Sequence, residues 1–259
     1  MMGTRFSVLF LIGLLIGLLL GAGLGSARAE DTASADPCEV PERIFTIDAS
    51  LPRALDRMKR ANALPILVVN TAKPGANRPE GSYPGLLERD LSARLPDRKV
   101  SVVVRNVPGA TAQEMLPTLD SALTAERPSL LVWQVGTVDA MRNIGPDSFG
   151  EAISSGIATA HRRGADIVVM DMQYSPQTTQ LITFQPYLDY VEWVTQNNDV
   201  FHFPRYEMMH YWFEEGRVGF TPDSKEDMLK AFQFVHRCIG RHLADAVTAM
   251  LDRAARPAQ

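Results

Sequence analysis

The sequence predicts an α/β fold with a central parallel sheet of about five strands, covered by helices on both faces. Two observations carry this prediction. Short β-branched runs alternate with longer helical stretches, and these runs are apolar throughout instead of alternating with polar residues. Continuous apolar strands are expected where both faces of a sheet are buried. Strand–helix–strand units imply right-handed crossovers, which make the strands parallel.

The elements follow in a regular order. Strands are expected at residues 66–69, 100–104, 130–135 and 167–170, with a weaker fifth strand beginning at 200–201. Helices are expected between them, at 83–95, 111–124, 149–163 and 187–196, and a short one at 51–61 precedes the first strand. The last helix begins near Lys225, and its apolar residues recur every three or four positions, so that one stripe packs on the sheet. No second core or internal repeat is visible, and residues 51–259 are predicted to be one domain.

The first thirty residues predict export. Arg5 precedes an apolar run over residues 6–25, and the Ala-Arg-Ala triplet at 27–29 supplies the small residues that signal peptidase requires. We therefore predict a signal peptide over 1–29, cleaved after Ala29, and a periplasmic or secreted protein. About twenty apolar residues can also span a bilayer as an uncleaved anchor. Membrane contact is expected only in that case. Residues 30–50 are predicted to be a flexible leader.

Charge and cysteine content narrow the possible partners and the compartment. Removal of residues 1–29 leaves 24 basic and 30 acidic residues, a net charge of −6 with neutral histidine. This argues against nucleic acid as a partner, because phosphate binding requires a basic surface.

The two cysteines, Cys38 and Cys238, stand near opposite ends of the mature chain. In an oxidising compartment they would form a disulfide that closes a loop of about 200 residues; two unpaired buried thiols are the alternative.

Several loops at the predicted strand ends resemble the SGNH/GDSL hydrolases, a family that cleaves acyl esters of lipids and carbohydrates. Residues 106–111, Asn-Val-Pro-Gly-Ala-Thr, resemble the family's second block, in which a glycine lies near the oxyanion. Residues 131–139, Leu-Val-Trp-Gln-Val-Gly-Thr-Val-Asp, resemble the third block, usually written Gly-Thr-Asn-Asp or Gly-Thr-Asn-Ala. Residues 164–174 and 205–212 resemble an exported alphaproteobacterial-type branch of the family. The resemblance covers about residues 38–246 and implies a flavodoxin-like three-layer α/β/α sandwich.

The position of the family's nucleophile is altered. In the family a serine ends the first strand, whereas the junction here is Val69-Asn70-Thr71-Ala72-Lys73. Depending on the alignment, the nucleophile falls on Val69, Thr71 or Ala72, and only Thr71 can attack a carbonyl. Alternatively, Asn70 and Thr71 cap the following turn. Lys73 adds positive charge that could hold an anionic or sugar group.

The oxyanion-hole positions are partly kept. Gly109 and Gly136 stand where the family has the glycines of its second and third blocks. The asparagine of the third block is Val138, whose side chain donates no hydrogen bond. Loss of one such donor typically costs about 3 to 4 kcal/mol of transition-state stabilisation. Asp139, next to it, is expected to cap the loop.

The family's base comes from an Asp-x-x-His motif before the last helix. Counting back from Cys238, the motif falls on Asp227-Met228-Leu229-Lys230, which has lysine in place of histidine; a placement on residues 223–226 also lacks histidine. A lysine acts as a base only where it is strongly desolvated, so an Asp227–Lys230 ion pair at helical spacing is the alternative. None of the five histidines falls at the base position, and no spacing of histidines, acids and cysteines predicts a metal site. We predict no metal and no cofactor.

These departures predict an exported hydrolase-fold protein that is catalytically impaired and acts as a binding protein of the cell envelope. Its ligand would be an acylated glycan, a lipid or an envelope protein, held around Thr71, Gly109, Gly136 and Lys230. The alternative is an active ester hydrolase or acyl transferase, with Thr71 as nucleophile and a desolvated Lys230 as base.

Overall fold

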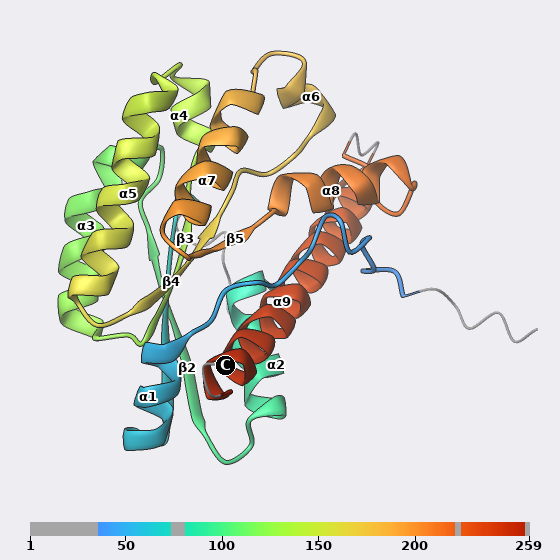
Figure 1. Ribbon diagram of the computed structural model, residues 1–259. Helices are drawn as coiled ribbons and strands as arrows, with labels where there is room; N and C mark the ends of the chain where they lie inside the picture. The colour runs from blue at the N-terminus through green and yellow to red at the C-terminus, as the bar shows by residue number, and fades with distance from the viewer. Residues whose placement is uncertain (1–35, 74–80, 221–223, 257–259) are drawn as a thin grey trace, which may run out of the picture. The chain divides into compact units, whose positions relative to one another are not determined.

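The computed structural model describes residues 36–73, 81–220 and 224–256. In this part of the chain, five parallel strands form one sheet in the order β2-β1-β3-β4-β5 (Figure 1). The strands are β1 (Ala63–Asn70), β2 (Lys99–Asn106), β3 (Leu130–Gln134), β4 (Asp166–Met170) and β5 (Phe201–Phe203). The predicted three-layer α/β/α fold and its strand number are confirmed. The predicted signal peptide, residues 1–29, lies outside the described residues.

The described helices include all those that the sequence pattern predicts. They are α1 (Pro52–Ala61), α2 (Tyr83–Arg94), α3 (Ala112–Glu126), α4 (Thr137–Met141), α5 (Pro146–Arg162), α6 (Pro176–Thr179), α7 (Gln185–Asn197), α8 (Arg205–Glu214) and α9 (Lys225–Ala255). The pattern did not predict α4, α6 and α8. Two of these are about one turn long, which is too short for helical periodicity to show, and in α8 aromatic and charged residues leave no clear apolar stripe.

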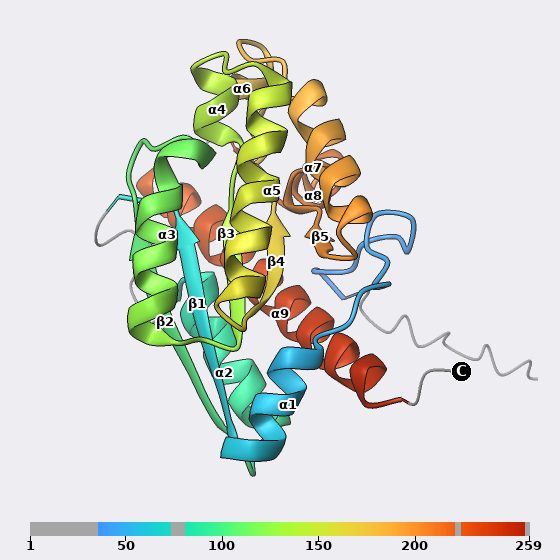
Figure 2. The same ribbon diagram turned by 60° about the vertical axis from the view of Figure 1, so that its left-hand side comes forward.

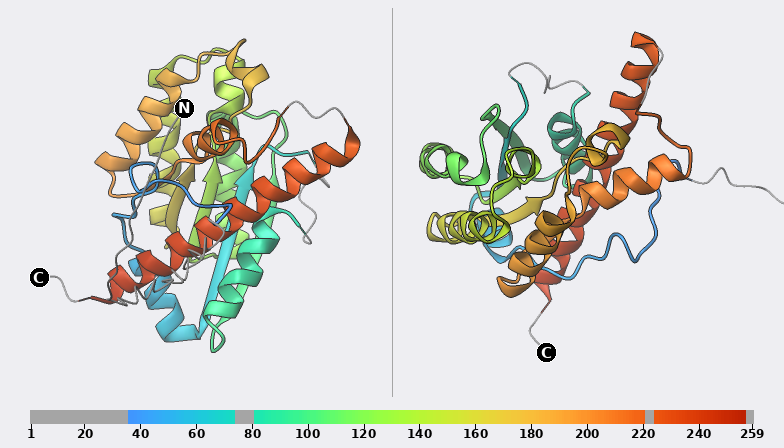
Figure 3. Two further views of the ribbon diagram at one scale, coloured as in Figure 1. Left: turned by 90° about the vertical axis from the view of Figure 1, so that its right-hand side faces the viewer. Right: turned by 90° about the horizontal axis from the view of Figure 1, so that it is seen from above.

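Both faces of the sheet are buried, which explains the continuous apolar strands. In β1, Leu64, Ile66 and Val68 belong to one core cluster, whereas Leu67 and Val69 belong to the other. Helices α2 and α9 cover the first face, and α3, α5 and α7 cover the second. Figure 2 shows α3 and α5 in front of the strands, and the left view of Figure 3 shows α9 running obliquely across the opposite face. Successive strand residues point to opposite faces, so each strand contributes to both cores.

The described part of the predicted flexible leader, residues 36–50, packs on the first core. Cys38 is only 1% exposed. The ring of Phe45 makes edge contacts with Phe201 and Phe203 of β5, at centroid distances of 6.0 and 5.7 Å. Val40, Ile44 and Ile47 also pack there. The prediction of a flexible leader is therefore wrong for residues 36–50, because the apolar residues that follow its small polar beginning are buried against the edge of the sheet.

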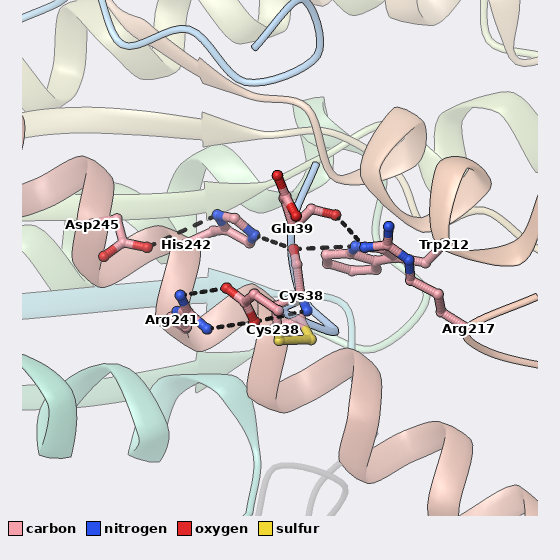
Figure 4. Close-up of a disulfide and its surroundings, with 9 residues drawn as sticks. Cys38, Glu39, Trp212, Arg217, Cys238, Arg241, His242 and Asp245 are labelled. Atoms are coloured by element: carbon pink, nitrogen blue, oxygen red, sulfur yellow. Dashed lines mark hydrogen bonds and ion pairs between the residues drawn. A yellow bond between two sulfur atoms is a disulfide. The ribbon is translucent and has the colours of Figure 1, made fainter. Parts of the chain in front are cut away.

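A disulfide ties this segment to α9 (Figure 4). Cys38 and Cys238 are bonded, with their Cα atoms 5.1 Å apart, which confirms the predicted pairing. The Cys38 carbonyl oxygen accepts hydrogen bonds from Trp212 Nε1 at 3.3 Å and from His242 Nε2 at 2.6 Å. On the surface, Arg241 Nη1 donates to Asp36 Oδ1 at 2.7 Å. The disulfide, the hydrogen bonds to the Cys38 carbonyl and the Arg241–Asp36 ion pair together hold the first described residues against α8 and α9.

Removal of the disulfide is expected to destabilise the fold. Crosslinking a loop of 200 residues limits the unfolded chain, so the double variant Cys38→Ser/Cys238→Ser should lose about 2 to 5 kcal/mol of unfolding free energy. Urea unfolding measures this difference. Dithiothreitol should lower the stability of the wild type by a similar amount and leave the double variant unchanged. Equal unfolding free energies with and without the crosslink would contradict this expectation.

Candidate functional site

The loops that follow the described strands meet at one edge of the sheet. Asn70 at the end of β1 is in register with Asn106 at the end of β2, and Gln134 of β3 is in register with Met170 of β4. In open parallel sheets, ligands bind beyond the carboxyl ends of the strands. This edge therefore holds the positions at which the sequence predicts a nucleophile and an oxyanion hole.

The β1 end forms a turn held by Asn70. This side chain is buried, and its Oδ1 accepts a hydrogen bond from the Ala72 amide at 2.9 Å, which is the geometry of an Asx turn. Thr71 is half-buried and Lys73 is exposed. No described residue makes a hydrogen bond to the Thr71 hydroxyl. Thr71, one of the three candidates for the family's nucleophile position, therefore has no base hydrogen-bonded to its hydroxyl in the described part of the chain.

The two glycine loops keep the backbone conformations that glycine permits. Gly109 and Gly136 have φ values of +69° and +94°, a region that disfavours other residues. A Cβ atom at Gly136 would lie 2.5 Å from Met172 Cε, the end of a flexible side chain that can move, so the positive φ is the stronger reason for glycine there. The Gly109 carbonyl accepts a hydrogen bond from Arg142 Nη2 at 2.8 Å, and this guanidinium also bonds Glu114 at 3.0 Å. The Arg142 contacts hold the Gly109 loop in place.

The third-block asparagine position carries no donor. Val138 is half-buried in the first turn of α4. Its neighbour Asp139 is buried, and Asp139 Oδ1 accepts a hydrogen bond from the Ala112 amide at 2.9 Å. Burial raises the pKa of Asp139, although the Ala112 amide opposes this shift. Asp139 thus joins α4 to the first turn of α3, where it acts as a cap for the Ala112 amide.

The base position lies on an exposed helical turn. Ser224 is the N-cap of α9, and its hydroxyl accepts a hydrogen bond from the Asp227 amide at 3.1 Å. The Asp227 carboxylate in turn accepts from this hydroxyl at 2.7 Å. The Lys230 ammonium pairs with Glu226 Oε1 at 2.8 Å and lies 3.7 Å from Asp227, with 64% of the Lys230 side chain exposed. At residues 227–230, where the sequence analysis places the motif, the structure has a helix cap followed by surface ion pairs. No described hydrogen bond or ion pair joins Thr71 to Lys230.

A group of buried polar side chains between α2, α8 and α9 was not predicted from the sequence. The Tyr83 amide donates to His236 Nδ1 at 2.9 Å, and the two rings stack at 5.8 Å. Burial, together with the nearby Arg205 cation, lowers the pKa of His236 to about 3. The imidazole is therefore neutral and carries its proton on Nε2. Burial also lowers the pKa of Arg205, with Tyr83 and Asp171 opposing the shift.

A histidine–carboxylate pair joins β5 to the residue that follows β4. Asp171 is fully buried, and its two oxygens contact His202 Nε2 at 2.9 Å and the Tyr206 amide at 2.8 Å. Among the described residues, no serine or threonine hydroxyl is hydrogen-bonded to His202. The pair fixes the start of α8 against β4, and it does not complete a catalytic triad with any described nucleophile.

Within the described ranges, no group of three or more histidine, cysteine, aspartate or glutamate side chains is arranged to hold a metal ion. Among the same residues, the helices fall short of the length or the apolar character that a membrane span requires.

The fold and the arrangement of these loops define an SGNH/GDSL-type hydrolase architecture. The chain belongs to the non-GDSL lipase-like family, whose model matches residues 37–253. The resemblance found in the strand-end loops is thereby confirmed. No curated protein matches the sequence.

Solved structures of esterases share this architecture. TesA is 20% identical and covers 73% of this chain and 99% of its own, with a TM-score of 0.53. The psychrotrophic esterase EstA from Pseudoalteromonas sp. is 14% identical, with coverages of 73% and 98% and a TM-score of 0.55. A catalytic mutant of Axe2, an acetylxylan esterase from Geobacillus stearothermophilus, is 14% identical, with coverages of 71% and 94% and a TM-score of 0.55. At these identities the likeness shows the fold alone.

The neutral state of His236 makes the stability depend on pH. In the unfolded chain a histidine titrates near its usual pKa of about 6.5, whereas His236 in the folded protein stays neutral down to about 3. Between these values the unfolded state binds an additional proton, so the unfolding free energy falls on acidification, by at most about 1.4 kcal/mol per pH unit from this group.

The variant His236→Asn tests this contribution, because its side-chain oxygen can still accept from the Tyr83 amide while the titrating group is gone. Urea unfolding at several pH values between about 6 and 4 should show a smaller slope in the variant than in the wild type. All other titrating groups are common to both proteins, so the difference isolates His236. Parallel pH profiles would show that His236 is protonated in the folded protein.

Proposed function

We propose that this chain is a hydrolase-fold protein of the cell envelope that binds a ligand without hydrolysing it. One observation carries the proposal: Lys230, at the position of the family's base, is solvent-exposed and paired with Glu226. A lysine becomes a general base only when it is desolvated or placed beside other cations. Lys230 is instead exposed to solvent, and its ammonium group pairs with the Glu226 carboxylate.

Two further positions support the same conclusion. Thr71 has no described base to take its proton, and Val138 supplies no side-chain donor to a developing oxyanion. A hydrolase that lacks its nucleophile or base typically keeps only about 10³ to 10⁴ of its acceleration over water. The missing donor adds a loss of about 3 to 4 kcal/mol in transition-state stabilisation. The alternative of an active hydrolase or acyl transferase that uses Thr71 and Lys230 therefore lacks a supporting contact.

The site that remains is suited to binding. Gly109 and Gly136 keep their positive φ values, and the loops that carry them are fixed by Arg142 and Asp139. The relatives in solved structures include an acetylxylan esterase. An acylated glycan, a lipid or an envelope protein is the ligand that we propose for the edge around Thr71, Gly109 and Gly136.

Ester turnover tests this function directly. The purified protein should hydrolyse p-nitrophenyl acetate and p-nitrophenyl octanoate no faster than buffer, since it lacks an activated nucleophile. Thr71→Ala and Lys230→Ala should match the wild type in the same assay. Turnover that exceeds buffer and is abolished by Thr71→Ala would contradict the proposal and establish the alternative.

The envelope location is supported by the disulfide, which is typical of exported proteins, and by the signal-peptide pattern of residues 1–29. Mass spectrometry of the protein isolated from its own cells should find a mature N-terminus at Glu30. An intact N-terminus would indicate an uncleaved membrane anchor instead.

A further inference from the structure

A cavity of 320 Å³ lies between the loop after β4, helix α8 and the first half of α9. We call it the Arg205 cavity; its walls include Gln173, Arg205 and His236 on the polar side. Its size falls at the lower end of the range for small-molecule sites, which is about 300 to 1,000 Å³. The lining residues do not include Thr71, Gly109 or Gly136, although the loop after β4 that lines the cavity also lies at the carboxyl edge of the sheet.

The Arg205 guanidinium is buried with its donors incompletely satisfied. Arg205 is only 5% exposed. Its Nη2 donates to Gln173 Oε1 at 3.3 Å, and its Nε has no hydrogen-bond partner among the described residues. The nearby Asp171 uses its two oxygens on His202 and the Tyr206 amide.

A buried cation is costly unless a charge partner and hydrogen bonds compensate it, and the desolvation penalty is several kcal/mol per ion. No described ion pair includes Arg205. The polar groups that share its wall include Gln173, Ser175 and His236, and all three are neutral, since His236 is held in its uncharged form. The cavity therefore offers a positive charge to an anion, and a carboxylate matches the planar guanidinium through two parallel hydrogen bonds.

The rest of the cavity is apolar and rich in rings. On α9, Met228, Ala231, Phe232 and Val235 line the cavity at helical spacing. Met228 and Phe232 are 59% and 39% exposed, an unusual state for large apolar side chains on one helix face.

Aromatic rings stand on two sides of this space. Phe232 lies against His236, with ring centroids 4.0 Å apart and ring planes tilted by 38°. From the other elements, Tyr174 and Phe220 line the cavity, with their own centroids 6.0 Å apart. Rings from different elements around one cavity favour a flat aromatic body through stacked and edge contacts.

We propose that the Arg205 cavity binds a small aromatic monocarboxylate, with the carboxylate on the Arg205 guanidinium and the ring between Phe232 and Tyr174. A free acid fits this site better than a neutral ester, because only a full negative charge compensates the buried guanidinium. The inference goes beyond the proposed function, since it adds a second site and names the charge and shape of its ligand.

Isothermal titration with trans-cinnamate, using the full mature protein, tests the site. Cinnamate should bind, and the neutral cinnamamide should bind at least tenfold more weakly, because it cannot form a hydrogen-bonded charge pair with Arg205. Octanoate, which has the carboxylate without the ring, should also bind more weakly than cinnamate. Equal binding of cinnamate and cinnamamide overturns the carboxylate assignment, and octanoate binding as tight as cinnamate overturns the aromatic one.

Variants locate the binding. Arg205→Gln should weaken cinnamate at least tenfold, and Arg237→Gln is the matched control, since Arg237 is exposed on α9 about 180° from Met228 around the helix axis. Unchanged affinity in a folded Arg205→Gln protein overturns the proposal. If that variant does not fold, Phe232→Asp decides: this rim residue is partly exposed, and the added negative charge should abolish cinnamate binding. Undiminished binding by Phe232→Asp also overturns the proposal.

The proposed function and the inference on the Arg205 cavity can be contradicted independently of each other. Ester turnover that depends on Thr71 would end the proposed non-hydrolytic function and leave cinnamate binding at Arg205 unaffected. Absence of cinnamate binding would end the inference on the Arg205 cavity and leave the esterase assay unchanged.

Discussion

The burial of both faces of the sheet is the constraint on which the rest of the structure depends. Because α2 and α9 cover one face and α3, α5 and α7 cover the other, the strands must be apolar throughout and joined by crossovers. Parallel strands then end at one edge, and polar loops gather there. The site lies at this edge because of the same pattern that stabilises the core, so the architecture does not depend on which residues the loops carry.

The residues to which the sequence analysis assigns the family's base stabilise the start of α9. In the family pattern an Asp-x-x-His motif precedes the last helix, whereas here Ser224 caps α9 and Asp227 and Lys230 lie within it. The Asp227 carboxylate accepts a hydrogen bond from the capping hydroxyl, and Lys230 pairs with Glu226 one turn earlier. Both groups are used to stabilise a helix terminus. The residues that remain from the motif therefore have a structural explanation that needs no catalysis.

The crosslinked N-terminal segment has a related role in fixing α9. The disulfide, the Trp212 and His242 hydrogen bonds to the Cys38 carbonyl and the packing of Phe45 hold the segment and the helix together. The first half of α9 extends past this anchor and lines the Arg205 cavity. The position of the cavity wall thus depends on contacts between the two ends of the described chain.

The sequence by itself determined the fold class, the order of the elements and the family, and it predicted the pairing of Cys38 with Cys238. These follow from local periodicity, from residue identity and from a resemblance carried by short loops. Only the tertiary structure decided that residues 36–50 are packed and that Arg205, His236 and Tyr83 lie together. Burial and hydrogen-bond partners depend on segments more than a hundred residues apart, as with Tyr83 and His236. An arginine and a histidine within apolar stretches carry no local sign of such partners, because periodicity reports only the face on which a residue lies.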